Sequence, residues 1–247
     1  MEGIYRIADR TILIRTLHAY THIKAAAFAA EGTADFTVEI AQADIDAERI
    51  RNARTDEAEG RGAKDHPDAY IESLAVYRKI AERLPLDDTV LFHGSSIAVD
   101  GVGYLFTAKS GTGKSTHTRL WRELLGERAV MINDDKPLIR VSETGATVYG
   151  TPWNGKHKLG TNASVPLRAI CVLERGEHNS IVRIEPKTAY PTLLQQIYRP
   201  DSREAMCRTL MLIDRMAETV ALYRLRCNME PDAARVSYLG MSGDSTI

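Results

Sequence analysis

The stretch that most constrains this chain is a glycine-rich segment at residues 108–115, Ala-Lys-Ser-Gly-Thr-Gly-Lys-Ser. It fits the phosphate-binding pattern G-x-x-x-x-G-K-[ST], except that alanine stands at the first position. Gly111 and Gly113 allow the backbone to curl so that successive N–H groups converge on phosphate oxygens. Apolar residues at 103–107 and an amphipathic pattern at 115–125 predict the strand and the helix that such a loop requires.

The side chains of this segment predict how a nucleoside triphosphate would bind. Lys114 would reach the outer phosphates, and the Ser115 hydroxyl would ligate Mg²⁺. Ser115 also starts the expected helix, whose dipole favours anions at this end. We expect the binding contacts to come from Ser110, Gly111, Thr112, Gly113, Lys114, Ser115 and Thr116. The sequence therefore predicts ATP and Mg²⁺ as ligands.

Two adjacent acids, Asp134 and Asp135, follow an apolar segment at residues 129–133. The intervening length accommodates one helix and one strand, which would return the acids to the loop. One acid would ligate the metal and the other would act as base for an incoming hydroxyl. Asp135 is our candidate metal ligand, but the sequence leaves the assignment of the two roles open. The alternative is a pair that only starts a turn before Pro137.

Composition and charge exclude several classes of protein. With 32 basic and 33 acidic side chains the net charge is −1, which gives no electrostatic basis for binding nucleic acid or an anionic membrane. No apolar run approaches the roughly 20 residues that span a bilayer, and we expect no secretory signal. Cys171, Cys207 and Cys227 are too widely spaced to predict disulfides or a metal centre. We expect them to be buried thiols of a cytoplasmic protein.

The pattern of apolar residues divides the chain near residue 88. We expect a small α+β region at 1–87, which could help to bind an acceptor, an α/β nucleotide-binding domain at 88–240 and a flexible tail at 241–247. In the first region the predicted strands are 3–16 and 33–40, the helices 44–51 and 68–84, and a linker or mobile loop 54–65. In the second region the predicted strands are 89–93, 97–99, 103–107, 129–133, 138–141, 146–149, 169–173, 181–184 and 221–226. The predicted helices are 115–125, 190–198, 202–219 and one from 231. Because hairpin strands surround the loop, we expect a mixed sheet, unlike that of an ordinary GTPase or adenylate kinase.

Three motifs in this order resemble the catalytic domain of HPr kinase, and they resemble the smaller HPr-kinase-like proteins more closely. They are the segment 93–106, the loop 110–115 with its continuation to Trp121, and the acid pair at 134–135. The loop form Ser-Gly-Thr-Gly-Lys recurs in ATP-dependent phosphoenolpyruvate carboxykinases, which share this nucleotide-binding architecture. The resemblance covers residues 88–176, with weaker similarity to about residue 240, and implies a mixed sheet of the same type.

The resemblance implies an ATP-dependent kinase that phosphorylates a serine-type hydroxyl on a protein, a peptide or a small molecule. Lys114 would neutralise the phosphates and Ser115 would ligate Mg²⁺. Asp134 and Asp135 would supply a metal ligand and the base, and His93 would lie near the transferred phosphate.

One segment departs from the family pattern. The family carries a metal-binding carboxylate in a later glycine-containing segment, whereas residues 151–162 here contain none. The segment thus offers no carboxylate for a second metal site, and we expect the phosphorylase reaction to run poorly. The sequence leaves open whether this activity is retained. Lys156 and Lys158, with His157, either contact phosphate or an anionic acceptor or form a solvated basic loop. Trp153 either anchors this loop or offers a flat surface to a substrate.

Two alternatives remain open alongside the kinase. The first is a carboxykinase-like enzyme that acts on a small molecule, although the chain shows no separate cluster of metal-binding histidine and lysine. The second is a module that senses ATP without catalysis, although a sensor needs no second acid beside the metal. A seryl acceptor is the predicted partner, and a homo-oligomer is compatible with the sequence.

Overall fold

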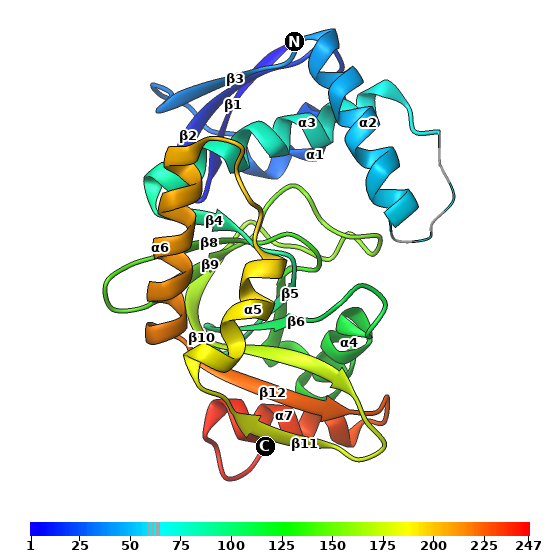
Figure 1. Ribbon diagram of the computed structural model, residues 1–247, viewed down its shortest axis with the longest axis vertical. Coiled ribbons are helices and arrows are strands. Elements are labelled where there is room, and N and C mark those ends of the chain that lie inside the picture. The colour runs from blue at the N-terminus through cyan, green and yellow to red at the C-terminus, as the bar shows by residue number, and fades with distance from the viewer. Residues whose placement is uncertain (59, 61, 63–64) are drawn as a thin grey trace. The chain divides into compact units, whose positions relative to one another are not determined.

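The protein is a mixed α/β protein with two compact units, Met1–Arg83 and Leu84–Ile247 (Figure 1). The computed structural model describes residues 1–58, 60, 62 and 65–247. The linker predicted at 54–65 lies partly outside the described residues, and its first five residues are helical.

The first unit contains a sheet ordered β1-β2-β3. Its hairpin turns at Ala8 and Asp9, which both have positive φ as a two-residue turn of this kind requires. β3 then pairs in parallel with β2. The elements are β1 (Glu2–Ile7), β2 (Arg10–Arg15), α1 (Tyr20–Lys24), η1 (Ala26–Phe28), β3 (Phe36–Glu39), α2 (Gln42–Ala58) and α3 (Asp68–Arg83).

Helix α2 is longer than the sequence predicted, since it runs on to Ala58 rather than ending at residue 51. Its second half is polar and shows little apolar periodicity, so the pattern of hydrophobic residues did not reveal it. Ion pairs to α3 hold the first half, where Arg78 of α3 binds Glu48 through two nitrogens and Lys79 binds Asp44 at 2.7 Å. The second half carries polar contacts along the helix itself, from Asn52 to Asp56 and from the Thr55 hydroxyl to the carbonyl of Arg51.

The second unit, residues 84–247, is described throughout and forms a nine-stranded mixed sheet. Its main path is β4-β8-β9-β10-β6-β5-β7, and β12 pairs with β10 and with β11. The strands are β4 (Thr89–Leu91), β5 (Ser95–Val99), β6 (Val102–Thr107), β7 (Ala129–Asn133), β8 (Leu138–Val141), β9 (Ala146–Tyr149), β10 (Ser164–Arg175), β11 (Ser180–Arg183) and β12 (Ala221–Cys227). The helices are η2 (Leu84–Asp87), α4 (Lys114–Leu125), η3 (Gly126–Arg128), α5 (Pro186–Gln196), α6 (Arg203–Thr219) and α7 (Asp232–Ser242). The strands predicted for this part of the chain and their hairpins are confirmed.

Alternate residues of β6 enter two different cores, one on each face of the sheet. Leu105 packs in the core that contains apolar residues of α5 and α6. Tyr104 and Phe106 pack in the core that contains apolar residues of α4 and α7. Because a strand directs successive side chains to opposite faces, a strand covered on both faces reads as one continuous apolar run. This arrangement fixes β6 firmly in the sheet, with the glycine-rich loop at its end.

Two helix boundaries and the exposure of a cysteine in the second unit differ from those expected. α5 begins at Pro186 rather than at residue 190, because proline suits the first turn of a helix. α7 extends to Ser242, where Met241 and Ser242 are buried, so the expected flexible tail begins no earlier than Gly243. Cys171 is buried as expected, whereas Cys207 is exposed because it lies on the outer side of α6.

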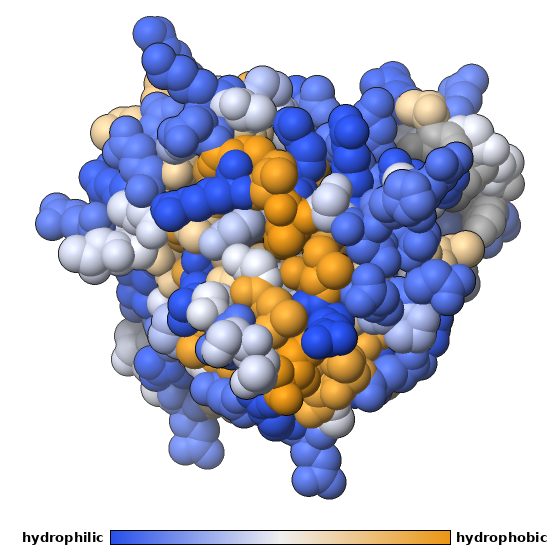
Figure 2. Space-filling model, turned by 90° about the horizontal axis from the view of Figure 1, so that it is seen from below, coloured by the Kyte–Doolittle hydropathy of each residue, from blue (hydrophilic) through white to orange (hydrophobic). Residues whose placement is uncertain are grey.

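The surface carries one feature that the sequence did not indicate. On the face drawn in Figure 2, hydrophobic residues form a band through otherwise hydrophilic surroundings. Within the described residues, no helix combines the length and the apolar character needed to cross a membrane.

Candidate functional site

One edge of the sheet in the second unit collects the residues predicted for the site. β5 runs antiparallel to both β6 and β7, so β6 and β7 run in the same direction and end at the same edge. The loop at 108–113 leaves from the end of β6, and Asp134 and Asp135 leave from the end of β7. His93 lies at this edge too, because it shortly precedes the start of β5. The topology thus brings together motifs that are far apart in the sequence.

The loop at 108–113 has the local geometry that its glycines predict. Gly111 and Gly113 have φ values of 77° and 122°, which residues with a side chain rarely adopt. The Lys114 ammonium folds back and donates a hydrogen bond to the carbonyl of Ala108, 3.1 Å away. The predicted succession of strand, loop and helix is therefore present, with β6 before the loop and α4 after it.

The residues predicted to bind the nucleotide are accessible to solvent. Ser110, Gly111 and Ser115 are exposed, and Thr112, Gly113, Lys114 and Thr116 are half-buried. A ligand can therefore reach all seven residues that the sequence predicted. Arg175, at the end of β10, donates a hydrogen bond to the carbonyl of Gly111 at 2.7 Å. No sequence motif pointed to this arginine, because only the pairing of β10 with β6 brings it to the loop.

A buried asparagine that the sequence reasoning missed holds the acid pair in place. Asn133 ends β7 with a fully buried side chain. Its Oδ1 accepts hydrogen bonds from the backbone N–H groups of Asp135 at 2.9 Å and Lys136 at 2.7 Å. Its Nδ2 donates to Thr151 Oγ1 at 3.0 Å and to the carbonyl of Trp153 at 3.2 Å. An asparagine directly before an acid pair was the available signal, because such side chains often cap the turn that follows them.

Replacing this asparagine is expected to destabilise the protein. Asn133→Ala removes four hydrogen bonds in a fully buried environment, and we expect it to lower the free energy of unfolding by about 2–4 kcal/mol. Urea denaturation measures this loss. Asn133→Asp keeps the two acceptor contacts but turns an acceptor oxygen towards the carbonyl of Trp153 in a buried site, so we expect it to be destabilising as well. A change below about 0.5 kcal/mol for Asn133→Ala would show that the turn is stable without the side chain.

The two acids have different surroundings. Asp134 is buried, and its Oδ1 accepts a hydrogen bond from the backbone N–H of Gly155 at 2.6 Å. The Asp135 side chain is 33% exposed, and its Oδ1 lies 3.6 Å from Nε2 of His93. Its Oδ2 lies 4.0 Å from the ammonium of Lys136. Asp134 is thus tied to the neighbouring loop, whereas Asp135 faces two basic groups.

His93 sits among groups of both charges. Its backbone N–H donates to the carbonyl of Gln196 at 2.7 Å. Burial lowers the pKa of His93 below its ordinary value, and the positive charge of Lys114 lowers it further. The carboxylate of Asp135 opposes this shift, while the charge of Lys136 adds to it. At neutral pH a neutral imidazole can accept a hydrogen bond or a proton.

The loop that carries the basic residues has a buried part and an exposed part. Trp153 is only 2% exposed, so it anchors the loop and offers no flat surface to a substrate. Lys156, His157 and Lys158 are exposed. The loop also packs closely at its start, where a Cβ on Gly150 would lie 1.8 Å from the carbonyl oxygen of Thr161. The structure therefore separates an anchoring tryptophan from a solvent-facing basic stretch.

Helix α4 is linked to α7 by hydrogen bonds to the buried hydroxyl of Ser237. Nε2 of His117 lies 2.9 Å from Ser237 Oγ, to which Trp121 also donates a hydrogen bond at 2.8 Å. Ser237 in turn donates to carbonyls within its own helix. Burial lowers the pKa of His117 from 6.5 to about 4. The helix that follows the loop is therefore locked by a neutral histidine.

This histidine predicts a dependence of stability on pH. Because the folded-state pKa of His117 is below the unfolded value, its contribution is complete above pH 6.5 and is lost as the pH falls towards 4. We expect the loss to reach roughly 3 kcal/mol at pH 4. Denaturation midpoints measured from pH 7 to pH 4 for the wild type and His117→Gln test this. If both proteins lose stability in parallel, His117 does not titrate as expected.

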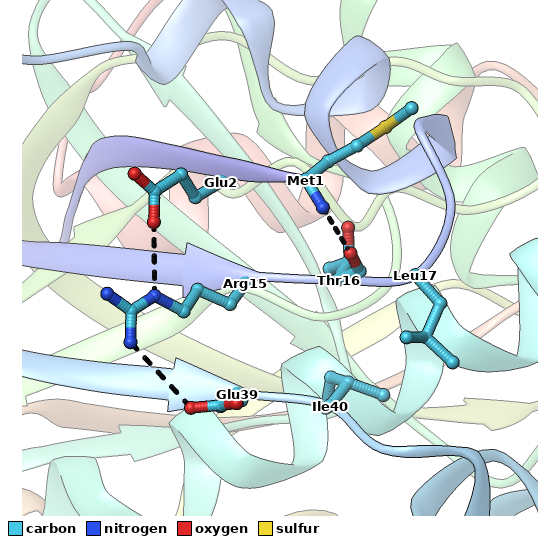
Figure 3. Close-up of a pocket in the computed structure, with 7 residues that line it drawn as sticks. All are labelled: Met1, Glu2, Arg15, Thr16, Leu17, Glu39 and Ile40. Carbon is cyan, nitrogen blue, oxygen red and sulfur yellow. Dashed lines mark hydrogen bonds and ion pairs between the residues drawn. The ribbon is translucent and has the colours of Figure 1, made fainter.

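A separate pocket lies in the first unit, where the ends of β1, β2 and β3 meet (Figure 3). It encloses about 400 Å³. Its charged side chains pair with one another, because Arg15 lies 3.1 Å from Glu2 and 3.8 Å from Glu39. None of the predicted site residues lines it. An arginine already paired with two carboxylates has little remaining attraction for an anionic ligand.

The described residues suit a magnesium ion that is coordinated partly by the protein and partly by the phosphates of a bound nucleotide. Among them, no group of three or more His, Cys, Asp or Glu side chains is placed to hold a metal ion. Mg²⁺ needs no such group, because it usually keeps several waters and takes one or two carboxylates together with substrate phosphates. The Ser115 hydroxyl and the acid pair are oxygen donors of this type. They fit Mg²⁺ carried by a nucleotide rather than a metal centre built from protein alone.

Comparisons with known proteins place the chain in a family. No curated protein gives a significant match. Among solved structures, the chain is similar to the HPr(Ser) kinase/phosphatase from Coxiella burnetii, with 10% sequence identity and a TM-score of 0.36. That alignment covers 62% of this chain and 99% of the other, and it is a distant structural similarity only. Residues 68–232 match the family described as SynChlorMet cassette protein ScmC, and because this match spans more than half of the chain, the protein belongs to the ScmC family.

Proposed function

We propose that this protein is an ATP-dependent kinase that transfers the γ-phosphoryl group to a serine-type hydroxyl on a protein, a peptide or a small molecule. The observation that carries the proposal is the meeting of the glycine-rich loop with His93, Asp134 and Asp135 at one sheet edge. A phosphoryl-transfer site needs a phosphate-binding loop, an oxygen ligand for magnesium and a group that receives the acceptor's proton. The serine-type acceptor comes from the resemblance of these motifs to HPr kinase.

The loop supplies the nucleotide site. Backbone N–H groups at residues 110–116 would surround the phosphates, at the start of α4 where the helix dipole favours anions. The Lys114 ammonium, which now contacts the carbonyl of Ala108, would turn towards the outer phosphates. Ser115 would offer its hydroxyl to Mg²⁺. Bound Mg²⁺ would neutralise charge on the outer phosphates and orient them for transfer.

The surroundings of the two acids favour different roles. The Lys136 ammonium repels a second cation, so the Asp135 carboxylate that it faces is the less suitable metal ligand. We therefore assign Asp135 as the base and Asp134, through the oxygen that does not accept the Gly155 N–H, as the ligand that joins Ser115 at Mg²⁺. This assignment gives each acid one task.

The transfer step follows from these positions. The acceptor hydroxyl oxygen forms a bond with the γ-phosphorus, while the bond from that phosphorus to the bridging oxygen of ADP breaks. ADP leaves with the electron pair, and the hydroxyl proton passes to Asp135. Neutral His93 would hold Asp135 and the acceptor in line, which suits the proton transfer. The bond formed to the acceptor oxygen is thus balanced by the bond broken to ADP, and Asp135 holds the released proton.

Incubation of the purified protein with Mg²⁺ and ATP labelled in the γ-phosphate tests the proposal. A kinase releases ADP and transfers label to serine-containing peptides or small hydroxyl compounds. A carboxykinase-like enzyme instead releases CO₂ from oxaloacetate in the presence of ATP. A sensing module binds ATP and shows no turnover with any acceptor. Absence of ATP binding in the intact protein would overturn the proposed function.

A further inference from the structure

Lys136 directly follows the acid pair and was not among the residues that the sequence predicted for the site. Its backbone is held on both sides, because its N–H donates to Asn133 Oδ1 at 2.7 Å and its carbonyl accepts from Thr151 Oγ1 at 3.3 Å. Its ammonium lies 4.0 Å from Oδ2 of Asp135. The backbone of Lys136 is therefore held in place, and its ammonium group lies near the carboxylate of Asp135, the proposed general base.

Stability does not explain this position. The side chains of Lys136 and Asp135 are 40% and 33% exposed, and ion pairs this open to water contribute little to folding. The charge of Lys136 nevertheless reaches the proposed centre, because it lowers the pKa of His93, as the charge of Lys114 also does. Two lysines, one at the start of α4 and one directly after β7 and the acid pair, thus act on the same histidine.

The negative charge of the transferred phosphoryl group gives Lys136 a role. The transferred group carries negative charge on its equatorial oxygens, and the enzyme must neutralise it. The loop at 151–162 contains no carboxylate for a further metal ion. Its lysines, Lys156 and Lys158, are exposed on the loop, whereas Lys136 lies beside Asp135. Lys136 is thus the better-placed positive charge.

We propose that Lys136 is a second phosphate-binding cation, in addition to Lys114, which contacts the γ-phosphoryl group during transfer. This inference rests on the proposed kinase function. Lys114 would bind the nucleotide before and after transfer, because it belongs to the loop. Lys136 would act mainly while the phosphoryl group moves towards the acceptor hydroxyl beside Asp135. The two lysines should therefore differ in which bound state they stabilise.

Calorimetric binding of two probes separates these states. The probes are Mg²⁺ with ADP, and Mg²⁺ with ADP and aluminium fluoride, which imitates the group in transfer. We expect Lys136→Ala to weaken binding of the aluminium fluoride complex on the order of 100-fold, while ADP binding changes less than about threefold. Lys136→Arg should restore much of the lost affinity, since it keeps the charge. Lys187→Ala removes an exposed lysine at the start of α5 and serves as the matched control.

Each outcome has a distinct meaning. If the wild type binds both probes and Lys136→Ala binds them equally well, the inference is overturned while the kinase proposal stands. If Lys136→Ala loses affinity for both probes to the same extent, Lys136 is a general nucleotide contact and the inference also fails. If the wild type binds neither probe, the proposed function itself fails. Circular dichroism spectra of each variant establish that the fold is retained.

Discussion

Lys114→Ala is expected to abolish phosphoryl transfer and to weaken ATP binding strongly. The ammonium is the positive charge that the loop directs at the outer phosphates, and a single preorganised charge of this kind contributes about 100-fold to 1,000-fold in rate. The fold should be unaffected, because the side chain is half-buried and donates a hydrogen bond to a loop carbonyl, that of Ala108, rather than to a core group. Calorimetry with Mg²⁺ and ATP measures binding, and release of ADP measures turnover.

Lys109→Ala provides the control for this prediction. Lys109 lies in the same loop and is exposed, but it stands outside the residues expected to bind the nucleotide. We expect that variant to keep nearly normal binding and turnover. If Lys114→Ala also keeps near-normal turnover, the loop at 108–113 does not bind a reacting phosphate.

Replacement of each acid by its amide should separate metal binding from proton transfer. Asp135→Asn is expected to lower turnover at least about 100-fold with little change in ATP affinity, because the amide cannot receive the proton. Asp134→Asn is expected to raise the Mg²⁺ concentration needed for half-maximal turnover. Its amide oxygen can still accept the hydrogen bond from Gly155, so the loop should stay in place. Titration of turnover with Mg²⁺ distinguishes the two effects.

Glu143→Gln tests whether loss of any acid in this unit has the same consequence. Glu143 is exposed in the turn between β8 and β9, where no role is proposed for it. Its replacement should change neither turnover nor the Mg²⁺ requirement. Equal and small losses for Asp134→Asn and Asp135→Asn would indicate that the pair only forms a turn before Pro137.

Much of the local structure could be predicted from the sequence. β6 is a continuous apolar run, the loop that follows has glycines where φ is positive, and α4 shows an amphipathic pattern. Asp100 and Gly101, between two of the predicted strands, both have positive φ, as a two-residue hairpin turn requires. The polar half of α2 could not be predicted, because its side chains show little apolar periodicity and its contacts are polar ones within the helix.

For the candidate site too, one part could be predicted from the sequence and another part depended on the tertiary structure. The sequence by itself determined the chemistry available, namely the glycine-rich loop, Lys114, the acid pair and His93, because each motif is encoded by neighbouring residues. Only the tertiary structure decided that β5 joins β6 to β7, so that these motifs share one edge. It also decided that Asp134 binds the Gly155 N–H while Asp135 faces a lysine. The physical reason is that local pattern follows from the period of a helix or a strand, whereas such contacts depend on sheet order and on burial between distant segments.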